Sequence, residues 1–338
     1  MAVHHTVRII PHERSISVPE NLPVLGAAQL AGLPLPHSCR SGRCGSCRAR
    51  LVSGRIEYPA GPPLGLSALE TRQGFVLLCQ ALARSDLVVE ARLIQSAAAA
   101  EIKTLPSRIA RRVQLAPDVM QLMLRVPAVE SMDFRAGQYL DVLLEGGARR
   151  SFSVANAPSS GGQYELHVRL VPGGRFSEAV FGGLREGALL RIEGPLGRFI
   201  YEPGTAPALF IAGGTGFAPI KAMLGQALVE TSPRELHLYW GARNPGGLYE
   251  EALVREWARR HAHFNVHTVL SHSAQPAAGY RTGWVHEAVL QDHPRLADFV
   301  IYAAGPPAMI EAIQNSFPAR GARAGQLHLD SFDYAAGP

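Results

Sequence analysis

The chain has 338 residues, a length that predicts two or three domains rather than one. Hydrophobic residues make up 47% of it and charged residues 18%, which argues against a disordered chain, and no apolar run reaches the roughly 20 residues that a membrane helix needs. The net charge is +5 and the 33 Lys and Arg residues are dispersed, which argues against nucleic-acid binding and favours a protein partner with an acidic face.

The first 95 residues predict a hairpin, a short helix and two further strands. The start, MAVHHTVRII, lacks the regions of a signal peptide, so we expect a cytoplasmic protein, where structural disulfides are rare. Strands are expected at 6–10, 14–18, 55–59 and 86–94. The helix is expected to begin near Glu20 or Asn21 and to end at Gly32.

The only cysteines of the chain follow the pattern Cys39-x4-Cys44-x2-Cys47, with Cys79 far downstream. A zinc ribbon would need two separate C-x2-C pairs, and structural cysteines would not explain three clustered thiols. The spacing matches that of plant-type [2Fe–2S] ferredoxins, in which four thiolates hold two irons. We therefore predict a [2Fe–2S] cluster on these four residues.

The loop between the clustered cysteines contains Gly42 and Gly45. Glycine allows the positive φ and the close backbone approach that a loop wrapped around a cluster requires. Together with the strand and helix pattern, this predicts that residues 1–95 form a β-grasp ferredoxin domain of the α+β class.

The segment QSAAAAEIKTLP has no amphipathic pattern and predicts a linker, which we place at residues 96–104. Residues 105–204 then predict a six-stranded antiparallel β-barrel, because six short strands are separated by Gly, Pro, Asn and Ser turns. These strands are expected within 108–116, 119–127, 138–145, 149–156, 164–171 and 189–195.

Residues 205–338 alternate short apolar strands with helices, which predicts an α/β domain with a doubly wound parallel sheet. The histidines of this region, among them His261, His263, His267 and His272, show no metal-ligand spacing. We expect most of them to be surface or strand residues.

The strand RRSFSVAN carries the first candidate site of the barrel. Arg150 and Phe152 are expected on one face of the strand, and Ser151 and Ser153 on the other. A guanidinium beside an aromatic ring suits a ring cofactor that carries phosphate. An ordinary half-exposed strand is the alternative.

Downstream, Gly173 and Gly174 are expected to open a helix with Ser177 in its first turn. Free backbone N–H groups and the helix dipole make such a position an anion site. A plain turn with a capping serine is the alternative, but the pairing with Arg150 favours a phosphate.

The segment IAGGTGFAPI joins a buried strand to a helix through Gly213, Gly214 and Gly216. Such a turn lets a pyrophosphate approach the backbone at the carboxyl end of a sheet, although Pro219 stands where the last glycine of G-x-G-x-x-G would fall. A second turn, YAAGPPAMIEA, is expected to flank the same crevice.

These segments together resemble the ferredoxin–NADP reductase superfamily, specifically its oxygenase-reductase branch with a fused N-terminal ferredoxin. The resemblance covers essentially the whole chain and rests on RSFSVANAP, HVRLVPGGRFS, GGTGFAPIKAML, YWGARNPGGLY and AGPPAM. Reductase components of terephthalate dioxygenase and CDP-deoxyglucoseen reductases are especially similar. The resemblance implies an FAD-binding barrel at 105–204 and an NAD(P)H-binding domain at 205–338.

The resemblance also implies roles for the flavin site, with FAD favoured over FMN. Arg150 would bind the flavin phosphate, Phe152 would stack on the isoalloxazine, and Ser153 would hydrogen-bond near its N5. Gly174 and Ser177 would hold the pyrophosphate. Ser151, His167, Val168, Arg169 and Gly173 are further residues expected to bind a cofactor.

For the nicotinamide site, the resemblance implies that Gly213 to Gly216 and Pro219 receive the dinucleotide, with Thr215 near the nicotinamide. Phe332 would cover the other face of the flavin. Gly305 and Pro306 belong to the family's Cys-Gly-Pro segment, in which this chain has Ala304 instead of cysteine, a change that affects the expected rate of flavin reduction. Ser153, Thr215 and Phe332 are thus the expected catalytic residues.

The implied activity is electron transfer from NADH or NADPH through FAD and the [2Fe–2S] cluster to a partner protein. Flavin exchanges both hydrides and single electrons, so it belongs between a nicotinamide and an iron–sulfur cluster. The leading expectation for the partner is a Rieske-type aromatic-ring oxygenase. The alternatives are a dehydratase of deoxysugar synthesis and, in another class, a non-enzymatic iron–sulfur sensor.

Two further expectations concern arginines. Arg40, Arg43 and Arg48 crowd the cluster loop and are expected to help dock an acidic face of the partner. Arg243, after the second strand of the nucleotide domain, is placed to meet a 2′-phosphate, so the coenzyme stays open between NADH, which we favour slightly, and NADPH.

Overall fold

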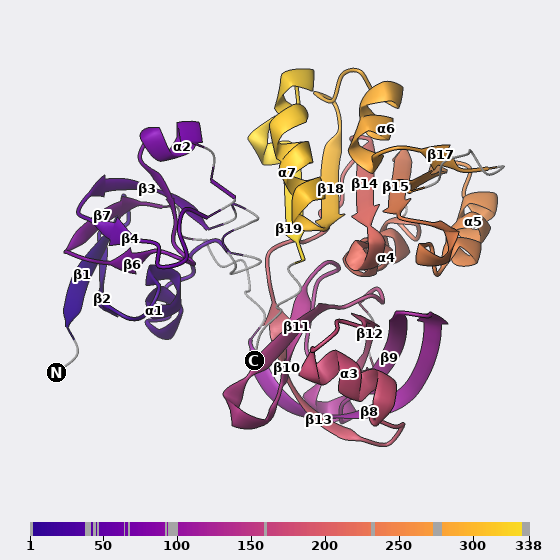
Figure 1. The fold of residues 1–338 in the computed structure, drawn as a ribbon, viewed down its shortest axis with the longest axis horizontal. Coiled ribbons are helices and arrows are strands. Elements are labelled where there is room, and N and C mark those ends of the chain that lie inside the picture. Colours follow the sequence, from indigo (N-terminus) through magenta and orange to yellow (C-terminus); the bar gives the residue numbers. More distant parts are fainter. Residues whose placement is uncertain are drawn as a thin grey trace. The chain divides into compact units, whose positions relative to one another are not determined.

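The computed structural model describes residues 3–37, 42, 45, 47–63, 65–66, 68–91, 93, 101–158, 161–230, 234–272 and 279–332. The chain divides into two compact units, Met1–Ala99 and Ala100–Pro338 (Figure 1).

The first unit is built on a five-stranded mixed sheet of order β2-β1-β7-β3-β5. Its strands are β1 (His4–Ile10), β2 (Arg14–Pro19), β3 (Arg48–Ser53), β5 (Phe75–Leu77) and β7 (Leu87–Glu90). The first and last of these in the chain, β1 and β7, pair in parallel, while β1 and β2 form the predicted hairpin. This is the arrangement expected of the β-grasp fold.

One face of this sheet is covered by the helix α1 (Val24–Leu30), and a small second sheet joins β4 (Ile56–Glu57) to β6 (Leu82–Ala83). The helix begins after Pro23, later than expected, because proline lacks the N–H that a helix interior requires. A short helix, α2 (Ala68–Arg72), precedes β5. Sequence analysis did not predict β3, β5, β6 or α2.

Six antiparallel strands form the barrel of the second unit, in the order β11-β10-β13-β8-β9-β12. Val154 and Leu166 form a bridge between the ends of the sheet, and the Ala155 N–H donates to the Glu165 carbonyl at 2.8 Å, which closes the barrel. The strands are β8 (Lys103–Ala116), β9 (Val119–Arg125), β10 (Tyr139–Leu143), β11 (Arg149–Ser153), β12 (Gln163–Arg169) and β13 (Leu189–Leu196).

The predicted linker was too long at its carboxyl end, because β8 already begins at Lys103 and includes Thr104 and Pro106. Pro106 pairs with Arg191 of β13, whereas pairing with β9 starts only at Arg108. At Pro106 the strand β8 is therefore paired on one side only. A proline, which lacks the N–H, is tolerated there because no hydrogen bond to a second strand is lost.

The remaining part of the second unit is a six-stranded parallel sheet of order β17-β16-β15-β14-β18-β19, as predicted. Its strands are β14 (Ala208–Gly213), β15 (Leu236–Ala242), β16 (Phe264–Leu270), β17 (Arg281–Thr282), β18 (Val300–Gly305) and β19 (Leu327–Ser331). The helices are α4 (Phe217–Ala227), α5 (Glu251–Arg260), α6 (Val285–Asp292) and α7 (Pro307–Ser316).

Two separate apolar cores show that this sheet is covered on both faces. Residues of α4 and α5 pack with Phe210, Leu238 and Trp240 on one face, and residues of α6 and α7 pack with Leu209 and Ile211 on the other. Alternate residues of β14 thus face opposite helix layers, which is the doubly wound arrangement.

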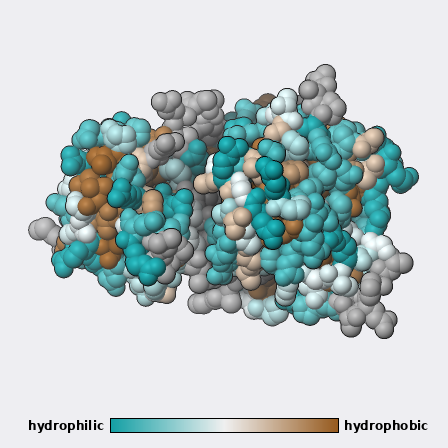
Figure 2. Space-filling model, turned by 90° about the horizontal axis from the view of Figure 1, so that it is seen from above, coloured by the Kyte–Doolittle hydropathy of each residue, from teal (hydrophilic) through white to brown (hydrophobic). Residues whose placement is uncertain are grey.

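The surface seen in Figure 2 is mostly hydrophilic, and its largest apolar area lies on the first unit, at the left. In the part of the chain that the structure describes, no helix has both the length and the apolar character needed to cross a membrane.

Candidate functional site

The iron–sulfur site is described at two of its four predicted ligands. Cys47 and Cys79 are buried in the first unit's core. The Leu78 N–H donates to the Cys47 carbonyl at 3.2 Å, so the segments that carry these two residues lie side by side. Cys39 and Cys44 lie outside the described residues.

The two glycines of the cysteine loop have the conformation that the sequence predicts. Gly42 and Gly45 have φ values of 75° and 72°. A Cβ atom on Gly42 would lie 2.8 Å from Gln80 Cγ and 2.9 Å from Pro63 Cβ, so the loop packs closely against the neighbour of Cys79. Buried thiols and a glycine loop held against Gln80 fit a [2Fe–2S] cluster.

Two polar side chains beside this site already have partners. Tyr58 accepts a hydrogen bond from the Leu77 N–H at 2.9 Å, and burial raises the pKa of Tyr58 to about 12. Arg48 pairs with Glu70 and lies over the ring of Phe75, so its guanidinium is engaged within the unit. Arg40 and Arg43 lie outside the described residues.

The strand β11 places the predicted flavin residues on the barrel surface next to its closing edge. Arg150 makes no ion pair within the described ranges and donates only to the Arg149 carbonyl, at 2.9 Å. The Phe152 ring lies 5.4 Å from that of Phe176. Ser151 donates to Asp141 at 2.6 Å, so its hydroxyl serves the barrel rather than standing free.

Ser153 is 5% exposed, and its Oγ has no hydrogen-bond partner among the residues that the structure describes. A buried hydroxyl without a partner is costly, so it points to a polar group that binds there. In the register set by the Val154–Leu166 bridge, Ser153 lies opposite His167, on the same face of the barrel wall. The site therefore fits the expected contact with a flavin nitrogen.

The predicted anion site opens the helix α3 (Arg175–Gly182). Gly174 occupies the position before its first residue, where a Cβ would lie 2.6 Å from Ser177 Oγ. Gly173, with φ of 76°, donates its N–H to the carboxylate of Glu178 at 2.7 Å. This backbone N–H thus already binds an anion, as expected of a helix start.

The turn after β14 and the turn after β18 pack against each other, as the sequence predicts. A Cβ on Gly216 would overlap the carbonyl oxygen of Ala304, and a Cβ on Gly213 would lie 2.6 Å from Pro306 Cδ. Thr215 between them is 8% exposed. Because β14 and β18 are neighbours whose following helices cover opposite faces, the two turns border the crevice in which α/β sheets bind ligands.

Residues of the barrel reach this crevice. The guanidinium of Arg169, on β12, lies within 3.1 Å of the position of a Cβ on Gly214, and its Nε is 3.5 Å from Asp118. Phe332 donates its N–H to the Gly305 carbonyl at 3.0 Å, which places it beside the turn after β18. Arg169 of the barrel and Phe332 thus lie next to the glycine turns that are predicted to bind the nicotinamide coenzyme.

Two remaining predicted cofactor residues, Arg243 and Val168, differ in the exposure of their side chains. Arg243, directly after β15, is exposed at the carboxyl edge of the sheet, where it is free to meet a ligand. Val168 is fully buried in the barrel core, so only its backbone is available to a cofactor.

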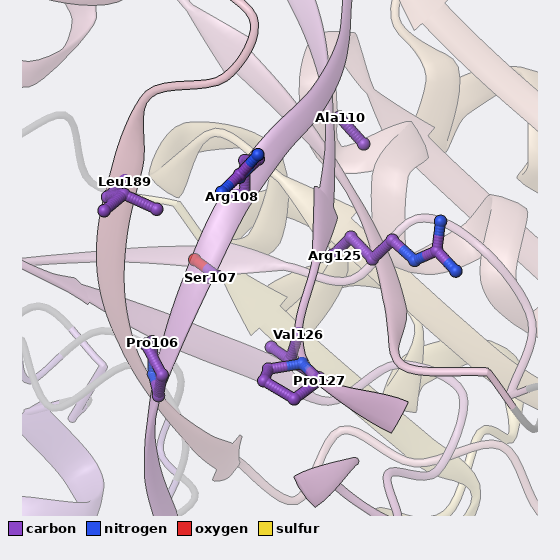
Figure 3. A pocket seen from close by; sticks show the side chains of 8 residues that line it. All are labelled: Pro106, Ser107, Arg108, Ala110, Arg125, Val126, Pro127 and Leu189. Carbon is purple, nitrogen blue, oxygen red and sulfur yellow. The ribbon is translucent and has the colours of Figure 1, made fainter. Parts of the chain in front are cut away.

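Sequence analysis gave no role to Glu165, Lys221 and Glu250, which meet His167 in a buried cluster of charges. A usable signal was present, since Lys103 and Lys221 are the only lysines of the chain. A shallow pocket on the barrel, lined by residues of β8, β9 and β13 and by Pro127, includes none of the predicted cofactor residues (Figure 3).

The fold and these sites define a class, the flavin- and nicotinamide-dependent oxidoreductases with an iron–sulfur domain. Three family descriptions match the chain: a 2Fe-2S iron-sulfur cluster binding domain over 7–84, an oxidoreductase FAD-binding domain over 106–201 and an oxidoreductase NAD-binding domain over 210–315. The chain belongs to the oxygenase-reductase branch of the ferredoxin–NADP reductase superfamily.

Relatives and solved structures extend over nearly the whole chain. The CDP-6-deoxy-L-threo-D-glycero-4-hexulose-3-dehydrase reductase of Yersinia pestis is 36% identical and covers 91% of this chain and 92% of its own. Reductase component 1 of terephthalate 1,2-dioxygenase from Comamonas is 34% identical and covers 98% of both. The crystal structure of an Amycolatopsis cytochrome P450 reductase is 31% identical, with a TM-score of 0.76, and covers 98% of this chain and 100% of its own.

The protein is thus an NAD(P)H-dependent electron-transfer reductase whose three domains bind a [2Fe–2S] cluster, FAD and NAD(P)H. When bound, the flavin accepts a hydride from the nicotinamide and passes single electrons to the cluster. Ala304, which stands where the resemblance implies a cysteine, is fully buried near the end of β18, and its carbonyl oxygen faces Gly216.

Proposed function

We propose that this protein is the reductase component of an aromatic-ring oxygenase, to whose Rieske-type terminal enzyme it delivers electrons from NADH. The observation that carries this proposal is the meeting of Arg169 and Gly214, which brings a flavin-binding barrel and a nicotinamide crevice together in a chain that also carries the ferredoxin cysteines. Similarity to the terephthalate and naphthalene dioxygenase reductases, 34% identical each, supports an oxygenase as the acceptor.

In this proposal the barrel holds FAD through four features of the chain. Arg150, without an acid partner among the described residues, neutralises the flavin phosphate, and Phe152 provides an apolar face for the ring. Ser153 donates its hydroxyl to the flavin near N5, which satisfies the buried Oγ. The pyrophosphate replaces the Glu178 carboxylate at the Gly173 N–H and lies against Gly174 and Ser177.

The nicotinamide coenzyme then occupies the crevice between the turns after β14 and β18. Gly213, Gly214 and Gly216 let its pyrophosphate approach the backbone, and Thr215 lies near the nicotinamide. Phe332 shields the flavin until the nicotinamide displaces it. The exposed Arg243 tolerates a 2′-phosphate, so we expect measurable activity with NADPH as well as with NADH.

The four cysteines Cys39, Cys44, Cys47 and Cys79 ligate the [2Fe–2S] cluster in this proposal. Arg40 and Arg43 are the docking residues for an acidic face of the acceptor. Arg48 contributes less, because Glu70 already neutralises its charge. We place the protein in the cytoplasm, where such thiolates stay reduced.

The proposal is tested by supplying the purified holoprotein and NADH, in separate reactions, with a Rieske-type aromatic-ring oxygenase and with a CDP-6-deoxyhexulose 3-dehydrase. The expected result is rapid reduction of the oxygenase's Rieske centre and formation of its hydroxylated product. Reduction of the dehydrase alone would assign the protein to deoxysugar synthesis, the alternative favoured by its 36% identity to the Yersinia reductase.

A further inference from the structure

A buried group of four ionisable side chains, which we call the Lys221 cluster, joins the flavin-binding barrel to the nucleotide domain. Glu165 and His167 come from β12 of the barrel, Lys221 from α4, and Glu250 from the residue before α5. Their side chains are 7%, 0%, 11% and 12% exposed.

Lys221 is the centre of this cluster. Its Nζ donates to Glu165 Oε1 and to Glu250 Oε1, both at 2.7 Å. The first of these bonds crosses from the nucleotide domain to the barrel, and the second stays within the nucleotide domain. One ammonium therefore links carboxylates of both parts.

A second contact crosses between the domains at His167, whose Nδ1 lies 2.9 Å from the hydroxyl of Tyr249. Within β12, His167 Nε2 donates to Glu165 Oε1 at 2.8 Å. Tyr249 in turn packs edge-on against Trp240 at 5.4 Å between ring centroids. The barrel strand is thus anchored both to charges and to the aromatic core of the nucleotide domain.

Glu165 is held in its ionised form by its neighbours in the cluster. Burial by itself raises the pKa of Glu165, but the hydrogen bond from His167 and the charge of Lys221 lower that pKa to about 2. Glu165 therefore remains a carboxylate throughout the neutral range, where its pairing with Lys221 is fully present.

A metal site is the obvious alternative, because ligand atoms of Glu165, His167 and Glu250 lie within 4.8 Å of one another. The ammonium of Lys221 sits 2.7 Å from both carboxylates and already supplies the positive charge. A divalent cation at the same place would meet that charge at close range. The Lys221 ammonium therefore occupies the position that a metal ion would take.

The residue type supports a specific role for the ammonium. The chain uses arginine almost everywhere, with Lys103 and Lys221 as its only lysines. An ammonium is a compact charge with three donors, whereas a guanidinium is a planar fork that needs more room. The compact ammonium of Lys221 donates to both carboxylates at 2.7 Å in this buried site.

The position of the cluster connects the two halves of the reaction site. On the barrel side, β12 continues from His167 to Arg169, which touches the Gly214 turn. On the other side, Lys221 lies on α4, two residues after Pro219 and one turn beyond the glycines of the nicotinamide crevice. A shift at Lys221 therefore moves one reaction partner relative to the other.

We propose that Lys221 is a positioning residue, which fixes the nucleotide domain against the barrel so that the nicotinamide meets the flavin at hydride-transfer distance. Such a reaction needs its atoms about 3–3.5 Å apart, and a displacement of about 1 Å costs roughly 100-fold in rate. This inference rests on the flavin and nicotinamide sites assigned under the proposed function, but not on the identity of the electron acceptor.

The first test is Lys221→Met, with Lys103→Met as the matched control. The Lys103 Nζ donates to the Ser131 carbonyl within the barrel and makes no bond to the nucleotide domain in the described part of the chain. Stopped-flow reduction of the bound flavin at saturating NADH is expected to slow by about tenfold or more in Lys221→Met, with unchanged FAD and iron content. Lys103→Met is expected to react at the wild-type rate.

The second test measures domain placement directly, without turnover. Spin labels on Leu189→Cys in the barrel and Val229→Cys in the nucleotide domain, both exposed positions, report their separation by pulsed EPR in the oxidised holoprotein. The wild-type background is expected to give one narrow distance distribution, and Lys221→Met a broader one. Lys221→Arg is expected to restore part of the rate and part of the narrow distribution.

Glu165→Gln covers the case in which Lys221→Met fails to fold, since glutamine keeps the volume and removes only the charge. It is expected to slow flavin reduction too, and a foldable double variant is expected to lose little more than either single variant, because both changes remove the same ion pair. Wild-type rates of flavin reduction in both single variants, or an unchanged distance distribution in the slower one, would overturn the inference. If the wild-type flavin itself were not reduced by NADH, the proposed function would fail instead.

Discussion

At the scale of single residues, the reaction site contains a buried polar group that has no hydrogen-bond partner among the described residues. Ser153 is the clearest case, because its buried Oγ has no partner while the neighbouring Ser151 is bonded to Asp141. Both serines fit the sequence pattern of a site, but only Ser153 has an unmet hydrogen bond. The structure thereby separates a ligand contact from a barrel contact.

The first prediction concerns this hydroxyl. We expect Ser153→Ala to slow flavin reduction by NADH about tenfold, which corresponds to about 1.4 kcal/mol, the order of one lost hydrogen bond. Thermal stability of the flavin-free protein is expected to stay the same or to rise slightly, because no protein bond is lost. Stopped-flow absorbance and thermal melts measure the two effects.

Ser316→Ala is the matched control for this prediction, since that hydroxyl donates to the Ala312 carbonyl on α7. Its flavin reduction should equal that of the wild type. A Ser153→Ala protein that reduced its flavin at full speed would remove Ser153 from the reaction.

At the scale of elements, the two turns at the carboxyl edge of the parallel sheet depend on each other. Gly213 and Gly216 have no room for a side chain because the turn after β18, with Ala304 and Pro306, occupies that space. These glycines are required by tertiary packing as well as by the approach of a phosphate. The element that binds the dinucleotide is therefore a pair of turns.

From this packing we predict that Gly216→Ala destabilises the protein by about 1–3 kcal/mol, the usual cost of overpacking, and weakens NADH binding more than tenfold. Calorimetric melts and titration of NADH under anaerobic conditions give the two values. Gly325→Ala, at a position with no neighbour within 4 Å of the added Cβ, is expected to change neither. Normal NADH affinity in Gly216→Ala would contradict this account of the turn.

A second element-scale feature is a stack of rings at the opposite end of the same sheet. His237 on β15 lies 4.9 Å from His293 after α6, and His267 on β16 stacks on Tyr239 at 4.3 Å. Burial lowers the pKa of all three histidines, against the attraction of Asp292 and Glu235. Their neutral forms are therefore favoured in the fold.

These lowered pKa values predict that acid destabilises the nucleotide domain. The histidines take up protons near pH 6.5 in the unfolded chain and less readily in the folded chain, so the free energy of unfolding falls as the pH drops through about 6.5. The groups that face the stack are Asp292, Glu235, Tyr239 and Arg281. Asp292, whose pKa is also lowered, loses its contribution only at more acid pH, below its ordinary value.

We expect the Tm to decrease by several degrees between about pH 7.5 and about pH 5.5, and to decrease less in a His293→Gln variant. His272→Gln, an exposed side chain in the same domain, serves as the control. Equal pH dependence in wild type and His293→Gln would show that the stack does not titrate on unfolding.

At the scale of the whole molecule, the electron must leave through the iron–sulfur unit, and the sequence places Arg40 and Arg43 in the cysteine loop. Arg48, in contrast, is committed to Glu70. Charge complementarity mainly raises the rate of encounter and is screened by salt. The charges of Arg40 and Arg43 are therefore expected to affect the rate of electron transfer to the partner protein, and not the rate of flavin reduction by NADH.

We predict that Arg40→Glu/Arg43→Glu slows reduction of the acceptor protein at low salt by tenfold or more, while flavin reduction by NADH is unchanged. Adding salt should narrow the difference between variant and wild type. Arg14→Glu/Arg55→Glu, the same charge change at exposed positions of the same unit, is the control. Acceptor reduction that stayed at the wild-type rate at low salt would refute this docking role.

Local patterns in the sequence predicted much of this protein because they are fixed by short-range chemistry. The cysteine spacing, the positive φ of Gly42 and Gly45, the glycine turn after β14 and the alternation of barrel strands each depend on neighbours in the chain. Local patterns did not predict the start of β8, because that start depends on pairing with a distant strand. Pro106 lies inside β8, where it pairs with β13 on one side and has no β9 neighbour on the other.

The Lys221 cluster and the histidine stack were decided only by the tertiary structure. Lys221 is separated from Glu165 by 56 positions and from Glu250 by 29, so no periodicity or spacing connects them. Their partnership arises because closing the barrel and winding the sheet bring three separate elements to one buried place. There, each charge is stable only in the presence of the others, a condition that exists in the folded protein and nowhere in the linear chain.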